Sequence, residues 1–201
     1  MLTEFKPKFS QIINLIAKPF IKINPNILTL IGLISPIFFF LFLYNKYYFL
    51  ALIMLGGILF DTIDGAVARM TNNTTAFGGF WDSSIDRVAD FLFISSFGFS
   101  GIVRWEIVVV VLFLSFLISY IRSRAELAAK GDLVLAVGII ERPERMIFIL
   151  LALISCWFFQ GVNMTFINFE FNLTEIVFII LGVFSTITIF QRFFAAYKLL
   201  K

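Results

Sequence analysis

The sequence predicts an all-α integral membrane protein: six transmembrane helices, preceded by an N-terminal amphipathic helix that lies at the membrane surface. The main observations are compositional. Of the 201 residues, 60% are apolar, and the mean hydropathy is +0.98. Long apolar runs also recur along the whole chain. A soluble domain of this length cannot bury so much apolar surface, so lipid must cover part of it.

The N-terminal segment, residues 9–24, places apolar side chains at helical spacing. Its isoleucines, leucine and phenylalanine alternate with Lys18 and Lys22, and Pro19 interrupts it. This pattern is typical of a helix that lies in the membrane interface. We therefore divide the chain into an interfacial segment, residues 1–24, and a six-helix membrane domain, residues 25–201. No Pro/Gly/Ser-rich linker or charge block indicates a further boundary.

Six apolar segments follow, each long enough to cross about 30 Å of hydrocarbon at ~1.5 Å per residue. Pro25 and Asn26 stand at the start of the first, where proline fits the first turn and asparagine can cap free amides. In the second segment, Gly56 and Gly57 favour close helix packing. The predicted spans are residues 25–44, 47–70, 80–101, 105–130, 141–160 and 171–197.

The basic residues predict the orientation of these spans. With both termini on one side, all 16 lysines and arginines except Lys46 and Arg104 fall towards that side. The positive-inside rule then places both termini on the cytoplasmic side. The net charge of +3 follows from this distribution, and it gives no reason to expect a nucleic-acid partner.

Two residue types limit the chemistry. The chain has no histidine, which excludes histidine-based catalysis and leaves carboxylates as candidate bases. The single Cys156 lies in an apolar run and can form no intramolecular disulfide. No cleavable signal peptide is expected, and the abundance of Ile, Phe and Asn indicates a prokaryotic source. The predicted location is the cytoplasmic membrane of a prokaryote, with membrane lipids around the helices.

Acidic residues gather in residues 61–90, within a chain that is otherwise lipid-soluble. Asp61, Asp64, Gly65 and Ala68 are spaced so that they share one helical face. Because charge inside a membrane is costly, acids in such a place indicate function. The glycine allows a ligand or a neighbouring helix to approach the backbone.

A second acidic face follows on the next helix. Asp82, Asp86 and Asp90 recur every four residues. Two antiparallel helices joined by the turn-prone segment 71–79 can aim both acidic faces at one point. Carboxylates that converge in a low dielectric need cations among them, and clustered hard oxygen ligands suit Mg²⁺, Mn²⁺ or Ca²⁺.

The stretch resembles the signature of the CDP-alcohol phosphotransferases, a family of integral membrane enzymes. It reads Asp-x-x-Asp-Gly-x-x-Ala-Arg from Asp61 to Arg69 and continues with Gly78, Asp82 and Asp86, without a departure. The resemblance implies that a phosphatidyl-type group leaves a CDP-linked lipid for an alcohol, with release of CMP. The residues alone also allow a purely structural set of ion pairs among Asp82, Asp86, Arg87 and Arg69.

The resemblance also implies roles for single residues. Asp86 is expected to be the catalytic base, and two Mg²⁺ or Mn²⁺ ions are expected as cofactors. The implied metal ligands are Asp61, Asp64, Asp82 and Asp86. The implied CDP-binding residues are Asn26, Thr29, Asp61, Gly65, Ala68, Arg69, Thr75 and Gly78. For Asn26, helix capping remains an alternative, and Asp90 is either a partner of Arg87 or a further ligand.

A second motif concerns the acceptor. Ser-Tyr-x-Arg-x-Arg-Ala-Glu at residues 119–126, followed by Glu-Arg-Pro-Glu-Arg at 141–145, resembles one branch of the family. That branch is the phosphatidylinositol-phosphate synthases and their archaeal-lipid counterparts, which use inositol 1-phosphate. The resemblance implies that Arg122, Arg124 and Arg192 bind the acceptor phosphate, and that the protein is a homodimer. The positive-inside rule alone also explains arginines here.

Several alternatives remain at this point. Glycerol 3-phosphate as acceptor and soluble CDP-inositol as donor keep the same chemistry, and the lipid can be diacylglyceryl or archaetidyl. A cation transporter also carries buried acids between helices. A structural membrane protein is the remaining possibility, and it would tolerate Asp→Asn changes throughout the cluster.

Overall fold

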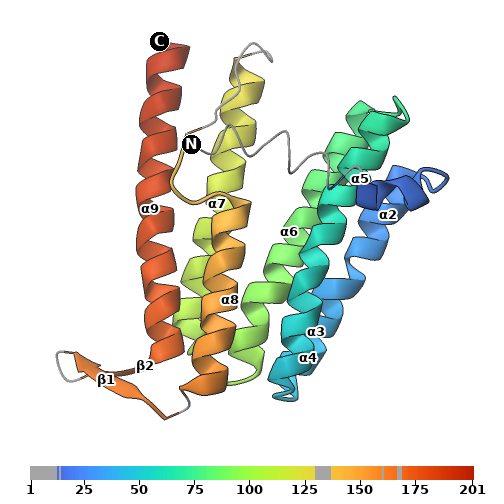
Figure 1. Cartoon of the computed structure of the whole chain (residues 1–201). Helices are drawn as coiled ribbons and strands as arrows, with labels where there is room; N and C mark the ends of the chain where they lie inside the picture. Colours follow the sequence, from blue (N-terminus) through green and yellow to red (C-terminus); the bar gives the residue numbers. More distant parts are fainter. Residues whose placement is uncertain (1–12, 14, 130–136, 160, 167–168) are drawn as a thin grey trace. The chain divides into compact units, whose positions relative to one another are not determined.

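The computed structural model describes residues 13, 15–129, 137–159, 161–166 and 169–201, without the side chains of residues 58–62, 166 and 169. The chain forms two compact units. One consists of Met1–Phe42 and Phe49–Leu92, the other of Leu43–Tyr48 and Phe93–Lys201. Helices make up most of both (Figure 1), which confirms the predicted helical class. The predicted domain division after residue 24 stays a prediction.

The first unit is built from short and medium helices. They are η1 (Lys18–Phe20), α2 (Pro25–Gly32), α3 (Ile34–Tyr44), α4 (Tyr48–Leu55), η2 (Gly56–Ile58), α5 (Leu59–Met70) and the start of α6 (Ala76–Phe99). Helix α2 begins at Pro25, and the Asn24 side chain accepts a hydrogen bond from the Asn26 amide at 3.0 Å. Asn24 is therefore the cap, and the capping explanation of Asn26 is wrong.

The N-terminal segment packs against this unit. Residues 15–17 are helical and lead into η1. A small core is formed by Ala17, Leu28, Ile63, Ala66 and Val67. Leu15 and Ile16 are exposed instead, as expected for residues that face lipid. Residues 9–12 and 14 lie outside the described residues, so the predicted amphipathic helix over residues 9–24 stays a prediction.

Two predicted spans are interrupted inside this unit. Leu33 separates α2 from α3, and η2 separates α4 from α5. The Ser35 hydroxyl donates a hydrogen bond to the carbonyl of Met54 across these helices. A Cβ at Gly57 would lie 2.5 Å from Ser35 Oγ, so only glycine permits this approach. The packing role predicted for Gly57 is confirmed, whereas the space around Gly56 is open.

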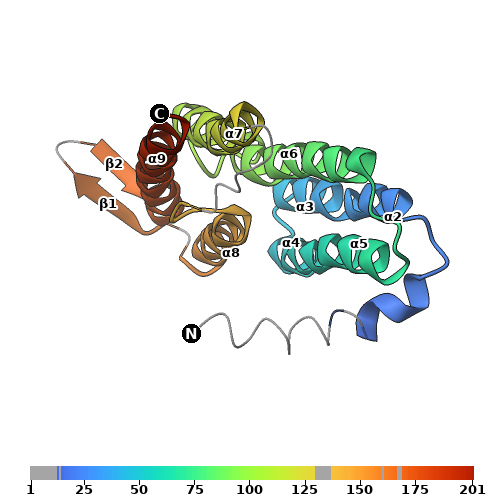
Figure 2. The same cartoon turned by 90° about the horizontal axis from the view of Figure 1, so that it is seen from above.

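The second unit contains the remainder of α6 and the long C-terminal helices. Its further elements are α7 (Trp105–Ala128), α8 (Arg142–Phe158), β1 (Asn163–Phe166), β2 (Phe169–Asn172) and α9 (Leu173–Leu200). Helices α7 and α9 run side by side, as Figures 1 and 2 show. A Cβ at Gly182 of α9 would be in ordinary contact with Val111 of α7, at 3.7 Å. The rings of Phe97 and Phe178 pack with centroids 5.0 Å apart.

Three segments of the described chain are long and apolar enough to cross a membrane: Pro25–Tyr44, Trp105–Ala128 and Leu173–Leu200. They coincide with the first, fourth and sixth predicted spans. The others differ for physical reasons. Helix α6 carries the acidic residues, α8 has 17 residues, and the second span is divided by η2. The count of six therefore stays a prediction.

A short hairpin between α8 and α9 is the one departure from the predicted all-α fold. Strands β1 and β2 pair antiparallel, with Asn163 opposite Asn172 and Met164 opposite Phe171. The alternating polar and apolar residues of both strands favour this pairing. Each strand has only four alternating residues, which are too few to predict a strand from the sequence.

The start of α9 is fixed by a group of polar contacts. Asn172 caps the helix, and its side-chain amide donates to the Ile102 carbonyl at 2.8 Å. Glu175 is buried, and its Oε1 accepts hydrogen bonds from Arg104 N at 3.1 Å and Arg104 Nε at 2.8 Å. The Arg104 guanidinium also lies 4.6 Å from the centre of the Phe171 ring. Arg104 thus joins the loop before α7 to the hairpin and to α9.

We expect Glu175→Ala to lower the free energy of unfolding by about 2 kcal/mol, since it removes half of a capping box and leaves the Arg104 contacts unmade. Thermal unfolding of the full chain in detergent, followed by tryptophan fluorescence, measures this loss. Glu170→Ala is the matched control, because only the Glu170 backbone carbonyl contacts Arg104. Equal losses of unfolding free energy from both substitutions would contradict the role given to the Glu175 side chain.

Candidate functional site

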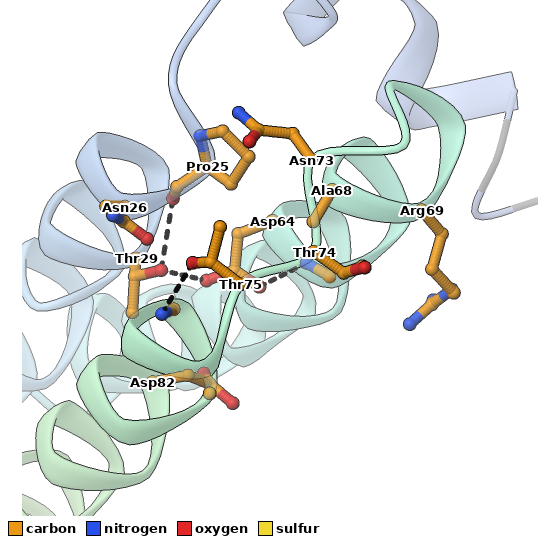
Figure 3. A pocket seen from close by; sticks show the side chains of 13 residues that line it. Pro25, Asn26, Thr29, Asp64, Ala68, Arg69, Asn73, Thr74, Thr75 and Asp82 are labelled. Carbon is orange, nitrogen blue, oxygen red and sulfur yellow. Dashed lines mark hydrogen bonds between the residues drawn. The ribbon is translucent and has the colours of Figure 1, made fainter.

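A polar pocket of about 210 Å³ lies in the first unit (Figure 3). It is formed by the start of α2, the C-terminal half of α5, the turn after α5 and the start of α6. Its lining residues are Pro25, Asn26 and Thr29; Asp64, Gly65, Ala68 and Arg69; Asn73, Thr74 and Thr75; and Gly78, Gly79 and Asp82. The antiparallel arrangement predicted for the two acidic helices is therefore consistent with a shared cavity.

Asp64 is the buried carboxylate of this pocket. Asp64 is 4% exposed, and its Oδ2 accepts a hydrogen bond from the Thr29 hydroxyl at 2.5 Å. The same hydroxyl lies 3.1 Å from the Pro25 carbonyl, so it is held at the start of α2. Figure 3 shows these side chains converging on the cavity. A short hydrogen bond to an ionised group is among the stronger contacts in a protein interior.

The opposite side of the pocket depends on a missing side chain. Gly78 donates its amide to Thr75 Oγ1 at 2.9 Å. A Cβ on Gly78 would lie 3.1 Å from that oxygen and 3.4 Å from Asn26 Oδ1. The Asn26 carbonyl accepts a hydrogen bond from Trp81 Nε1 at 3.2 Å, which ties α2 to α6. Glycine therefore keeps the backbone of α6 open to a ligand between these polar groups.

Gly65 and Arg69 lie on the α5 side of the pocket. Arg69 is exposed, and its Nη1 would lie 3.3 Å from a Cβ at Gly65. An exposed guanidinium beside an open stretch of backbone can form bidentate contacts with an anion such as a phosphate. All the predicted CDP-binding residues except Asp61 thus line one pocket.

The predicted metal ligands are only partly visible. Asp64 and Asp82 line the pocket, whereas the Asp61 side chain lies outside the described residues. Asp86 is not a lining residue, and its Oδ2 lies 3.7 Å from Arg87 Nη2. Among the described side chains, no group of three or more His, Cys, Asp or Glu is arranged to hold a metal ion.

The sequence left two interpretations of Asp90 open, as a partner of Arg87 or as a further metal ligand. Asp90 is 5% exposed, and its Oδ2 lies 4.0 Å from Arg87 Nη1. It does not line the pocket. The interpretation of Asp90 as a partner of Arg87 therefore fits the structure.

The second unit contains a buried arginine with several acceptors. Arg192 is 2% exposed, and it donates to the carbonyls of Ile118 and Val137, both at 2.8 Å. Its Nη2 also lies 3.2 Å from Glu141 Oε1. Gly138 makes the approach of this loop possible, because its φ of +139° and its contacts leave no room for a Cβ.

Other charges surround Arg192. Arg122, Arg145, Glu126 and Glu141 all lie within electrostatic range of its guanidinium. Arg122 Nε pairs with Glu126 Oε1 at 2.9 Å, and Arg145 is 1% exposed. Of these five described groups, three are guanidinium groups and two are carboxylates, so together they carry one net positive charge. Such an arrangement suits a bound anion.

Arg124 does not join this cluster. It lies in a groove with Phe193, Ala196 and Tyr197 on another face of α7 and α9. Residues two positions apart on a helix point about 200° apart, so Arg122 and Arg124 lie on different faces of α7. The structure therefore brings together Arg122 and Arg192 of the predicted acceptor residues, and separates Arg124 from them.

Some lining and cluster residues were not predicted. Asn73 and Thr74 line the polar pocket through a turn whose conformation the sequence did not specify. Arg145 belongs to the Glu-Arg-Pro-Glu-Arg motif at residues 141–145. In the structure it is buried within electrostatic range of Arg192. Its position one helical turn inside α8 was the available signal.

Known proteins identify the fold and the family. The sequence model of the CDP-alcohol phosphatidyltransferase family matches residues 22–195 of this chain. The chain belongs to this family. As a CDP-alcohol phosphatidyltransferase it is a membrane transferase of phospholipid biosynthesis, which confirms the predicted enzyme class. The transporter and structural alternatives have no support.

Two relatives of this CDP-alcohol phosphatidyltransferase are informative. The archaetidylinositol phosphate synthase of Pyrococcus horikoshii is 36% identical over 204 residues, covering 100% of this chain and 99% of the relative. The phosphatidylinositol phosphate synthase of Mycobacterium tuberculosis with CDP-DAG bound gives a TM-score of 0.75 at 26% identity, covering 93% and 94% of the two chains. The same enzyme with manganese and citrate gives 0.72 at 26% identity, covering 92% and 88%.

We expect Thr29→Val to reduce turnover of a CDP-alcohol donor by tenfold to a hundredfold. Valine keeps the shape but leaves the buried Asp64 without its hydroxyl donor, which costs roughly 1.5–3 kcal/mol. Steady-state kinetics in detergent micelles measure the loss. Thr29→Ser is the control, since it retains the hydroxyl and should stay near wild type. If serine behaved like valine, the hydrogen bond would not be the cause.

Proposed function

We propose that this chain transfers a phosphatidyl-type group, diacylglyceryl or archaetidyl, from a CDP-linked lipid to inositol 1-phosphate and releases CMP. The polar pocket supports this most directly, because six of the eight signature residues line it: Asp64, Gly65, Ala68, Arg69, Gly78 and Asp82. The names of the relatives support the inositol phosphate acceptor. The proposal assigns the pocket to the donor and the buried arginine cluster to the acceptor.

In the donor pocket, backbone and side chain have separate tasks. Gly65 and Gly78 leave room for the diphosphate near the helix backbone, while Arg69 supplies positive charge. Asn26, Thr29 and Thr75 provide amide and hydroxyl groups for the cytidine side of the donor. Ala68 is small enough to leave the α5 wall open. Asp61 is assigned to this pocket by the signature alone.

The donor set of the pocket fits a hard divalent cation. Asp64 and Asp82 contribute carboxylates, and the neighbouring polar atoms are hydroxyl and amide oxygens. With Asp61 and Asp86 they would hold two Mg²⁺ or Mn²⁺ ions. A bound cation would neutralise charge on the diphosphate and on the departing CMP. The related mycobacterial enzyme has been solved with manganese.

Asp86 is the proposed base. Its carboxylate accepts the proton of the acceptor hydroxyl while the alkoxide oxygen forms a bond to the lipid-linked phosphorus. The bond from that phosphorus to CMP breaks, and CMP leaves with the electron pair. Arg87 Nη2 lies 3.7 Å from Asp86 Oδ2 and helps to orient this carboxylate. Positioning of the hydroxyl contributes more than basicity, because an ionised carboxylate is a weak base.

The acceptor phosphate is assigned to Arg122 and Arg192, joined by Arg145. Arg192 has a fixed geometry, since two backbone carbonyls and Glu141 hold it. Arg122 is partly exposed and pairs with Glu126 four residues along, so it can exchange this partner for a phosphate. The excess positive charge of the cluster complements a dianionic phosphate.

Membrane orientation and oligomeric state complete the proposal. Both termini and the donor pocket face the cytoplasm of a prokaryote, on the strength of the basic residues. A homodimer is expected from family likeness. Glycerol 3-phosphate and soluble CDP-inositol stay as alternative substrates for the acceptor experiment below.

Asp86→Asn is expected to abolish transfer while CDP-lipid binding stays measurable. The amide keeps the volume of the carboxylate but cannot accept the hydroxyl proton at neutral pH. Release of CMP from a CDP-lipid measures turnover, and retention of radiolabelled CDP-lipid measures binding and shows that the variant is folded. Near-normal turnover in this variant would refute the assigned role.

The acceptor is tested by offering radiolabelled inositol 1-phosphate and glycerol 3-phosphate with the same CDP-lipid. We expect label from inositol 1-phosphate to enter the lipid, and Arg122→Gln to raise its KM at least tenfold with the KM of the donor unchanged. Arg192→Gln should do the same if it folds. Preferred incorporation of glycerol 3-phosphate would replace the acceptor but leave the donor assignment intact.

A further inference from the structure

A groove of about 620 Å³ lies between the C-terminal halves of α7 and α9, and neither Arg122 nor Arg192 lines it. We call it the Arg124 groove. Its lining includes Tyr120, Arg124 and Ala125 of α7, and Phe193, Ala196 and Tyr197 of α9. Figures 1 and 2 show the two helices side by side, so the groove runs between neighbouring helices of one unit.

The shape of the groove follows from small residues. Ala125 is 5% exposed and Ala196 is half-buried, and both line the groove. Larger side chains stand around them, and Phe193 remains 65% exposed. Two alanines between bulky neighbours leave space in the groove for part of a ligand. Exposing the aromatic rings beside the groove to water would cost free energy. They lie on long apolar helices, where lipid can cover them.

The groove also has polar groups. Arg124 and Lys201 contribute two cations, and Tyr120 and Tyr197 contribute phenol groups. Lys201 Nζ lies 3.5 Å from the Tyr197 hydroxyl, so a cation and a phenol are held together in the groove. Acidic side chains are absent from the described lining of the groove. Tyrosine and basic residues at the end of a membrane helix are the groups that meet lipid headgroups.

From these observations we infer that the Arg124 groove binds an anionic phospholipid of the surrounding membrane, with its phosphate against Arg124 and Lys201 and a chain along Ala125 and Ala196. Charge selects the headgroup: basic pockets between membrane helices attract anionic lipids. The apolar lining of the groove selects an amphiphile over free phosphate. This assignment does not depend on the identity of the acceptor, and it gives Arg124 a role apart from Arg122 and Arg192.

The test uses the full chain in detergent, titrated with phosphatidylglycerol or phosphatidylcholine and followed by native mass spectrometry. Excess CDP is present to occupy the donor pocket. We expect the first phosphatidylglycerol to bind more tightly than phosphatidylcholine. Arg124→Gln should weaken it about fivefold, the effect of removing one cation near a lipid surface. Ala196→Leu should weaken it too, because the leucine fills part of the groove without a change in charge.

Lys198→Gln is the matched control. Lys198 is also basic and near the end of α9, but it lies in a different hollow with Val137 and Gln191. It should leave phosphatidylglycerol binding unchanged. An equal effect of Lys198→Gln, no effect of Ala196→Leu, or equal competition by inorganic phosphate would each overturn the inference. Loss of a dimer in Ala196→Leu with lipid binding unchanged would assign the groove to a second copy of the chain and overturn it as well.

Discussion

The hydrogen bond from the Thr29 hydroxyl to the Asp64 carboxylate is the contact on which the polar pocket depends. It joins the start of α2 to the middle of α5, two helices that also share an apolar core through Leu28, Ile63 and Val67. A carboxylate in such a place costs several kcal/mol unless polar groups or cations stabilise its charge. The pocket is therefore built around a charge that the surrounding helices alone would not tolerate.

The rest of the first unit positions this contact. Pro25 and the Asn24 cap fix where α2 begins, which places Thr29 one turn later. The apolar core with Ala66 and Val67 fixes the rotation of α5, so that Asp64 faces α2. Gly78 then allows α6 to approach without closing the cavity. Ordinary packing and capping thus provide the geometry, and the carboxylates provide the chemistry.

Much of this could be predicted because helical period is a strong signal. The spacing of Asp64, Gly65 and Ala68 placed them on one face, and all three line the pocket. The turn residues Asn73 and Thr74 could not be predicted, since loop conformation is not periodic. The hairpin of β1 and β2 was missed because four alternating residues are too few to distinguish a strand. The separation of Arg122 and Arg124 was available from their spacing, but the shared motif concealed it.

Two contacts far apart on α9 have a joint consequence for the register of this helix. Glu175 is bonded in its first turn and Arg192 in its C-terminal third, about 25 Å further along. A shift of one residue at the first contact would turn the helix by about 100° and move Arg192 away from its carbonyl acceptors. Substitutions in the loop before α7 can therefore displace the Arg192 guanidinium from the far end of the bundle, by altering the phase of a single helix.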